Sequence, residues 1–240
     1  MKKVIFIAAS FFALAACNKE VISSPEEGVG YLNFSLAADD IVVSTKTQVS
    51  ELDDYNVYIN GQSHEYGSEI KGKVLTKSPG EYTVYAENIT PAEANQGRGS
   101  LRLMSAQQSL NIEAGETKTV TLECGAVNAK IEVIFNQSFQ NAFQTWSLTL
   151  GYENDDVRDL TSSDEQSAVF YYEPGKLALE LTATSQNGVK THSEPITVVG
   201  GYHYTVNYSA GENGYLGITV TADDKLLDAD DNNVTVNPYI

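Results

Sequence analysis

A cysteine near the start of the chain is the side chain with the clearest chemistry. The segment 1–16 combines a positive start, Lys2 and Lys3, with an apolar core and a pair of small residues, and Cys17 follows directly. This is the order of an export signal with a lipobox, in which the cysteine at the cleavage point receives two or more acyl chains. Because such chains hold a protein on a bilayer almost permanently, we expect membrane lipid to be a partner through acylated Cys17. An ordinary signal peptide followed by a chance cysteine is the alternative.

Groups that could catalyse a reaction are few and lie far apart in the sequence. The histidines, His64, His192 and His203, form no motif with a neighbouring serine, cysteine or aspartate, and the chain contains no GxSxG, HExxH or phosphate-binding loop. Cys124 has no histidine, lysine or arginine within five residues and ends an alternating stretch, so we expect a small buried side chain there. The sequence therefore predicts a protein without enzymatic activity and without a cofactor.

Aspartates late in the sequence raise the question of a metal site. The run from Asp228 to Asn232 begins like a calcium loop, but Asn233 stands where such a loop needs glycine, and Tyr239 stands where it needs glutamate. An EF-hand is therefore excluded. A looser site remains open, with a solvated acidic hairpin tip as the simpler alternative; its ligands would be Asp223, Asp224, Asp228 and Asp230. The acidic run at residues 153–156 has the same two interpretations.

Tyrosine is the abundant aromatic residue, with 14 in the chain against one tryptophan. Glycan-binding proteins stack sugars on exposed aromatic faces, and some of these tyrosines fall off the apolar face of the expected strands. The candidates for ligand stacking are Tyr58, Tyr85, Tyr171 and Tyr172. Tyrosine also forms strands well and tolerates water at its hydroxyl, so an outward tyrosine needs no ligand. A carbohydrate platform is therefore an alternative function.

The elements that would carry these side chains are strands. Apolar and polar residues alternate with a period of two from Tyr31 to Ala38, and the same pattern returns along the chain. The further stretches are residues 55–59, 81–87, 117–124, 129–135, 146–152, 176–185, 202–208 and 216–222. Thr90–Glu93 predicts a capping box on a helical turn, and Phe139 with Phe143 at i,i+4 predicts another turn. Glycine turns predict hairpins between consecutive strands, at Asn60-Gly61, Ala114-Gly115 and Gly200-Gly201.

The strand order repeats along the chain. Pro79–Val84 and Pro174–Leu179 each open with Pro-Gly and each precede a second strand, a glycine turn and a β-branched strand. We therefore predict an all-β chain with two tandem immunoglobulin- or transthyretin-like β-sandwich domains. The expected organisation is a signal peptide 1–16, a lipidated flexible tether 17–29, a first β-sandwich domain 30–125 and a second β-sandwich domain 126–240. The short link near Gly125-Ala126 predicts a stiff two-domain rod.

The chain is strongly acidic, with a formal net charge of −17 at pH 7. A surface of this charge repels phosphate backbones and anionic lipid headgroups. We therefore expect no nucleic acid among its partners.

Several stretches resemble one known family. Gly30–Leu36 after the lipobox, Pro79–Tyr85, and Gly115–Cys124 continuing through Asn128–Val133 resemble the fimbrillin-like lipoproteins of Bacteroidetes, an uncharacterised group labelled as cell-adhesion proteins. The resemblance covers essentially the whole chain after Cys17. It implies two transthyretin- or immunoglobulin-like sandwiches, outer-membrane anchorage, and a role as adhesin or pilus component.

One feature departs from that family. Polymerising members resemble precursors that are cut after an arginine to open a groove for a neighbour's strand, but this chain has no arginine before Arg98. An arginine-specific cut in the tether is therefore excluded, which favours a lipid-retaining anchor, an accessory subunit or a stand-alone adhesin over a main shaft subunit.

Two functional hypotheses follow. The first is an outer-membrane-anchored, cell-surface lipoprotein without enzymatic activity, adhesin-like or a fimbria accessory component, which pairs strand edges with fimbrial subunits. The second is a carbohydrate-binding lipoprotein for capture of a glycan or another host surface ligand.

Overall fold

The structure, a computed structural model, describes residues 28–38, 52–153, 155–164, 166–211, 215–223 and 234–236. The predicted signal peptide and most of the predicted tether, with Cys17, lie outside these residues, as do Asp224, Asp228 and Asp230. Within the described part, no helix has the length and apolar character needed to cross a membrane.

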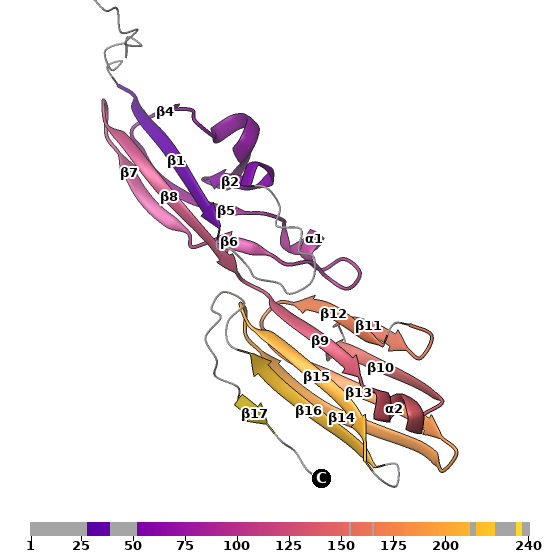
Figure 1. The fold of residues 1–240 in the computed structure, drawn as a ribbon. Helices are drawn as coiled ribbons and strands as arrows, with labels where there is room; N and C mark the ends of the chain where they lie inside the picture. Colours follow the sequence, from indigo (N-terminus) through magenta and orange to yellow (C-terminus); the bar gives the residue numbers. More distant parts are fainter. Residues whose placement is uncertain are drawn as a thin grey trace, which may run out of the picture.

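The first lobe contains the eight strands that precede residue 127 and forms one hydrogen-bonded sheet (Figure 1). The strand order is β3-β2-β5-β6-β8-β1-β4, and β7 pairs with β5. β1 is parallel to β8, and the other pairs are antiparallel. The strands are β1 (Gly30–Ala38), β2 (Asn56–Ile59), β3 (Gln62–Glu65), β4 (Leu75–Lys77), β5 (Gly80–Glu87), β6 (Leu103–Ser105), β7 (Gln108–Ile112) and β8 (Thr117–Ala126).

The second lobe follows directly, since β8 runs into β9 with two residues between them (Figure 1). One sheet has the order β11-β10-β13-β14 and the other has the order β12-β9-β15-β16-β17. β9 is parallel to β15, and the other pairs are antiparallel. The strands are β9 (Ala129–Phe135), β10 (Thr145–Tyr152), β11 (Asp155–Thr161), β12 (Ser167–Tyr172), β13 (Gly175–Ser185), β14 (Gly188–Val198), β15 (His203–Ala210), β16 (Leu216–Asp223) and β17 (Val234–Val236).

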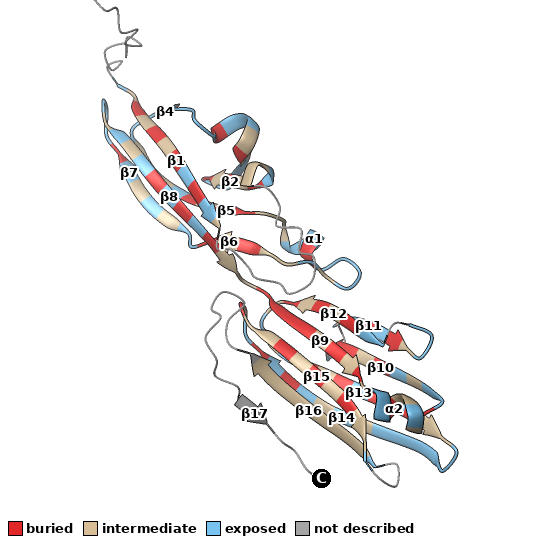
Figure 2. Ribbon diagram, in the orientation of Figure 1, coloured by how far each residue is buried: buried red, intermediate tan, exposed pale blue. Residues whose placement is uncertain are grey.

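Each lobe encloses its own core, and the period of two in the sequence decides which side chains enter it. In β1, Leu32, Phe34 and Leu36 are buried while Ser35 faces outward, as the alternating colours of Figure 2 show. The first core draws its residues from between Leu32 and Cys124, and the second from between Ala129 and Tyr208. In the second lobe both sheets contribute to one core, so the two sheets pack face to face.

The predicted all-β class is confirmed. The second lobe has two packed sheets, whereas the strands of the first lobe surround their core as one continuous sheet. The immunoglobulin- or transthyretin-like arrangement and the domain boundaries stay predictions, because separate cores do not by themselves show that each lobe folds alone.

The hairpin predictions have a mixed outcome. Asn60 and Gly61 have φ angles of 50° and 79°, and they join β2 to β3 as predicted. The other two hairpins are wrong, since β7 pairs with β5 while β8 pairs with β6 and β1, and β14 pairs with β13 while β15 pairs with β9 and β16. Alternation tells which face of a strand is buried, but it does not tell whether a glycine turn returns the chain within one sheet or carries it to another strand partner.

Both predicted helical turns are present. α1 (Pro91–Ala94) begins at Thr90, whose hydroxyl accepts from the Glu93 amide at 3.3 Å while the Glu93 carboxylate accepts from the Thr90 amide at 2.8 Å. α2 (Gln137–Ala142) begins at Asn136, and its Phe139 lies in the second core. A 3-10 turn η1 (Leu52–Asp54) and a π-helical turn η2 (Tyr66–Ile70) complete the described elements.

Candidate functional site

The junction between the lobes is built around Asn128, which lies between β8 and β9 and is 1% exposed. Its side-chain amide donates to the Ser100 carbonyl at 2.8 Å, and its side-chain oxygen accepts from the Arg102 amide at 3.0 Å. Its backbone carbonyl accepts from the Gly201 amide of the second lobe at 3.0 Å. One buried asparagine therefore ties the segment before β6 to the turn before β15.

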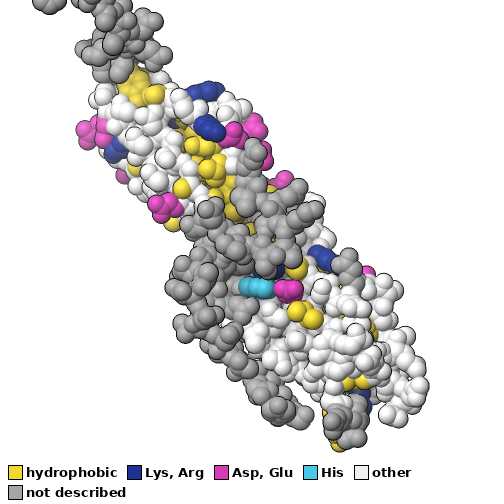
Figure 3. All heavy atoms as spheres, in the orientation of Figure 1, with side chains coloured by type: hydrophobic (Ala, Val, Ile, Leu, Met, Phe, Trp, Pro, Cys, Tyr) yellow, Lys and Arg dark blue, Asp and Glu magenta, His cyan; other side chains and the backbone are white. Residues whose placement is uncertain are grey.

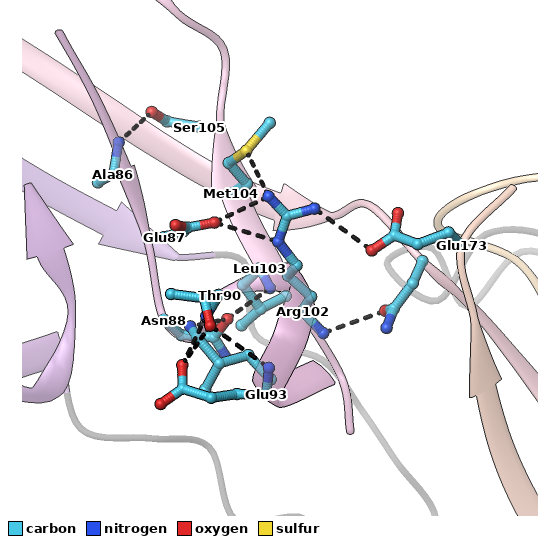
Figure 4. A network of polar contacts seen from close by, with 12 residues as sticks. Ala86, Glu87, Asn88, Thr90, Glu93, Arg102, Leu103, Met104, Ser105 and Glu173 are labelled. Carbon is cyan, nitrogen blue, oxygen red and sulfur yellow. Dashed lines mark hydrogen bonds and ion pairs between the residues drawn. The ribbon is translucent and has the colours of Figure 1, made fainter. Parts of the chain in front are cut away.

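A half-buried guanidinium crosses the same junction. Arg102 donates from Nε and Nη2 to Glu87 Oε2 at 3.1 and 2.8 Å, and from Nη1 to Glu173 Oε1 at 3.3 Å (Figure 4). Glu87 belongs to β5 of the first lobe, and Glu173 follows β12 of the second. Burial alone would lower the pKa of Arg102, but the hydrogen bonds and charges of the two carboxylates outweigh it, so the pKa is raised. The arrangement holds a fixed charge between two lobes and is not suited to proton transfer.

The backbone of the first lobe also pairs with β12. The Tyr171 amide donates to the Arg98 carbonyl at 2.9 Å, and Arg158 Nη1 donates to the Tyr171 carbonyl at 2.8 Å. Gly99 lies against this contact with φ of +83°, and a Cβ there would lie 2.5 Å from the Tyr171 oxygen. At Gly200 of the second lobe, a Cβ would lie 2.1 Å from the Val127 oxygen. Two glycines thus permit the close approach of the lobes.

The structure places Tyr58 and Tyr85 together, as paired residues of β2 and β5. Their rings stack with centroids 4.5 Å apart and planes 4° from parallel. Burial and then the nearby Glu87 carboxylate raise the pKa of both hydroxyls. Each ring gives one of its faces to the other, so the pair leaves less free aromatic surface than two separate platforms would.

The other two tyrosines do not form a platform. Tyr172 is 0% exposed, its hydroxyl donates to the Leu150 carbonyl at 2.6 Å, and the Arg158 guanidinium lies 4.1 Å from its ring centroid. The prediction of Tyr172 as a stacking residue is therefore wrong, because β12 turns this side chain into the core. Tyr171 faces the opposite side and is half-buried, with burial raising the pKa of its hydroxyl.

The histidines lie on different strands, each beside a glutamate. The pairs are His64 with Glu69 at 2.8 Å, His192 with Glu194 at 3.3 Å, and His203 with Glu132 at 3.2 Å. In the described residues, no cluster of three metal-binding side chains exists. Asp223 ends β16, and the other three predicted ligands lie outside the described residues, so the acidic site stays untested.

Further candidate groups are engaged in packing. Cys124 is buried at 1% exposure, as predicted, with its Sγ 3.7 Å from the Ala86 carbonyl oxygen. In the second acidic run, Asp156 pairs with Arg158 at 2.9 Å. The acidic side chains visible in Figure 3 occur in several places on the first lobe and do not form one patch.

Sequence reasoning missed the residues of the junction and one exposed aromatic residue. Arg102 and Asn128 stand in no motif, and their partners lie up to 71 residues away in the chain, so no local pattern could have found them. Tyr215 is 71% exposed, and the available signal was its place in the sequence, directly after two nearby glycines, Gly211 and Gly214, and before an alternating stretch.

The sequence and the fold both have counterparts among known proteins. Residues 28–238 match the family model described as a domain of unknown function, DUF4493. No curated protein matches the chain. Similar solved structures include a putative cell adhesion protein from Bacteroides ovatus, with 12% identity, TM-score 0.47, and coverage of 87% of this chain and 100% of that one.

Two further solved structures come from other species. The tip fimbrial protein Mfa3 from Porphyromonas gingivalis has 10% identity, TM-score 0.46, and coverage of 81% of this chain and 99% of that one. Putative polysaccharide binding proteins (DUF1812) from Bacteroides thetaiotaomicron have 10% identity, TM-score 0.44, and coverage of 87% of this chain and 98% of that one. These are proteins of the kind that the resemblance in the sequence named. At such identities and TM-scores they do not establish what this chain binds.

Proposed function

The chain belongs to the DUF4493 family of unknown function, and from this premise we propose that it is a non-enzymatic, adhesin-like lipoprotein, an accessory or anchoring component of a surface fibre. In this proposal the acylated Cys17 holds it on the outer membrane, facing the cell surface. The two lobes extend from the membrane and present a strand edge to a neighbouring subunit.

The observation that carries the proposal is the edge strand β14. It is 11 residues long and, among the described strands, pairs with β13 alone. The other edge of that sheet, β11, has a register irregularity in its pairing with β10 and carries Asp155, Asp156 and Asp159, which are features that discourage pairing. β14 is therefore the more accessible edge for an added strand.

Pro195 indicates how an added strand would bind. Proline within a sheet sits on an edge strand with its nitrogen turned away from the neighbour, because it has no N–H to donate. By the alternation of an antiparallel ladder, Val189, Thr191 and Ser193 then also turn their N–H and C=O groups away from β13. These groups form a row that an extended partner strand can pair with.

The junction supports the same role. Asn128, Arg102 and the Tyr171 backbone connect the lobes through buried or half-buried hydrogen bonds. A protein that carries force between a membrane and a fibre benefits from such a stiff connection. The separation of the histidines and the burial of Cys124 agree with a role without catalysis.

The strand-pairing test uses Ser193, which is exposed on β14. Ser193→Pro removes one outward N–H without removing a bond to β13, whereas Ser193→Ala keeps that N–H and serves as the matched control. We expect the proline variant to be recovered with sheared surface fibres at a small fraction of the control's level, with both variants equally abundant in the cell. Equal recovery of the two variants, or absence of the unmodified protein from fibres, would contradict the proposal.

The anchor is tested with the two cysteines of the chain. Cys17→Ala should abolish incorporation of a labelled fatty acid and release the protein from the outer-membrane fraction, while Cys124→Ala should leave both unchanged. Labelling that survives Cys17→Ala would remove the anchor from the proposal.

A further inference from the structure

A groove of about 280 Å³ lies in the second lobe between β14 of one sheet and β16 of the other. Side chains from both strands line it: Lys190, His192 and Glu194 on one wall, and Tyr215, Leu216 and Ile218 on the other. Because the two strands belong to different sheets, no ladder closes the space between them.

The β16 wall presents an aromatic ring above aliphatic side chains. Of the large hydrophobic side chains exposed in the described part, Tyr215 is the aromatic one, at 71% exposure. Leu216 and Ile218 follow it and pack against the second core. An exposed aromatic face on a fixed aliphatic base is a surface on which a flat, partly apolar ring can stack.

The β14 wall presents donors and acceptors. The Nε2 atom of His192 lies 3.3 Å from Glu194 Oε2, without the alignment of a hydrogen bond, and the two side chains are 26% and 35% exposed. The Lys190 side chain is exposed at the same wall. A carboxylate, an imidazole and an ammonium group facing an aromatic ring form the mixed lining of a small-molecule site.

A buried tyrosine lies beside one of the lining residues of the groove. Tyr208 of β15 is 0% exposed, pairs in register with Ile218, and has a hydroxyl without a hydrogen-bond partner in the described part of the protein. Burial, followed by the charge of Glu194, raises the pKa of this hydroxyl. An unpartnered buried hydroxyl is destabilising, but Tyr208 does not line the groove, so the polar groups that a ligand can reach there come from the β14 wall.

We propose that the β14–β16 groove binds a single neutral sugar ring, stacked on Tyr215 and hydrogen-bonded to Glu194 and His192. A sugar has one apolar face and a rim of hydroxyls, which matches one aromatic wall and one polar wall. The carboxylate of Glu194 and the acidic chain disfavour an anionic ligand.

The size of the groove restricts the ligand further. At about 280 Å³ it lies at the lower limit of ligand pockets, so it suits one ring and not a long chain. A partner strand on β14 would use the outward backbone groups of that strand, whereas the sugar uses its inward side chains. The sugar site therefore goes beyond the fibre role, and either can fail without the other.

The test is saturation-transfer NMR on the full-length protein in detergent, with the methyl glycosides of glucose, galactose, mannose and N-acetylglucosamine as probes. We expect at least one glycoside to bind. Tyr215→Ala and Glu194→Gln should each weaken it about tenfold or more, whereas Tyr208→Phe should leave it unchanged.

Two control variants separate binding in this groove from binding elsewhere on the protein. Tyr58→Ala removes another outward tyrosine and should leave the glycoside affinity unchanged, and Ser193→Pro should do the same while it lowers recovery with fibres. Absence of binding for all four glycosides, or binding that survives Tyr215→Ala, overturns the proposal. So does a result in which a peptide copy of residues 30–37 binds in a Tyr215-dependent way while the glycosides do not, because the groove would then be a strand site.

Discussion

The two lobes place their first strands in different surroundings. In both lobes this strand is parallel to a later one, β1 to β8 and β9 to β15. On its other side, however, β1 has the three-residue strand β4, whereas β9 has the six-residue strand β12. β1 is therefore held more by its inward side chains, and β9 more evenly by side chains and by ladders on both sides. A similar order of strands can thus leave the first strand of one lobe with only a short neighbour on one side, while the first strand of the other lobe has longer neighbours on both sides.

The largest expected effect concerns the residue that joins the lobes. Arg102→Met would leave the Glu87 carboxylate, 4% exposed, without its partner. Breaking a buried ion pair in this way costs about 3–5 kcal/mol of unfolding free energy, measured by chemical denaturation. Glu173→Gln removes the other carboxylate, which is 30% exposed, and should cost under about 1 kcal/mol. Equal losses of unfolding free energy in the two variants would contradict the pairing of the Arg102 guanidinium with the buried Glu87 carboxylate.

The next effect tests whether the lobes are separate units. Leu32→Ala in β1 and Ile131→Ala in β9 each remove a side chain that is 0% exposed, at a cost of about 2–5 kcal/mol. Because the cores do not share residues, each change should speed amide hydrogen exchange mainly in its own lobe.

The exchange rates of the unmodified protein are the reference for that comparison. In the unmodified protein we expect the amides of β1 to exchange faster than the amides of β9. If either alanine variant speeds exchange equally in both lobes, the chain is one cooperative unit and the predicted domain boundaries fail.

A smaller effect distinguishes two buried tyrosines of the second lobe. Tyr172→Phe loses a hydrogen bond to the Leu150 carbonyl and should cost about 1 kcal/mol. Tyr208→Phe removes a hydroxyl without a partner in the described residues and should cost nothing or stabilise the fold. Thermal unfolding at neutral pH measures both, and a larger loss for Tyr208→Phe would contradict the unpartnered hydroxyl.

The same tyrosines give the fold a dependence on alkaline pH. Burial raises the pKa of the hydroxyls of Tyr172 and Tyr208 above the ordinary value of 10.0. As the pH rises, the unfolded chain therefore loses these protons before the folded chain does. The contribution of the two hydroxyls to the free energy of unfolding is fully present below pH 10 and is lost as the pH rises above it. Tyr208→Phe should make that loss less steep in denaturation curves measured from pH 9 to 11.

The smallest effect compares the single helical turns of the two lobes. Thr90→Ala and Asn136→Ala each remove a side-chain oxygen that accepts from a helix amide, at about 3.3 and 3.0 Å. Each should cost at least about 0.5 kcal/mol, and more for Asn136→Ala because α2 carries the buried Phe139. A larger loss of unfolding free energy for Thr90→Ala than for Asn136→Ala would contradict the expectation that the turn with the buried Phe139 contributes more.

Patterns within a few residues predicted the local structure well. The period of two placed Leu32 and Val133 in the cores, and Thr90–Glu93 formed its capping box. The same patterns failed at the partners of strands, as the two wrong hairpins show, and at Tyr172, a candidate stacking residue that lies in the core. A shift of one residue in the alternation of apolar and polar residues exchanges the two faces of a strand. The predicted face is therefore least reliable for residues near the ends of strands, next to a turn.

The sequence by itself determined that this protein is made mostly of strands, and which side chains of the alternating stretches enter its cores, because both depend on side chains a few positions apart. Only the tertiary structure decided that Arg102 lies between Glu87 and Glu173, that Tyr58 stacks on Tyr85, and that Tyr215 stands at a groove opposite His192 and Glu194. Those contacts join residues brought together by sheet order and packing, and the free energy that selects a sheet order is summed over the whole lobe and is not carried by any single stretch.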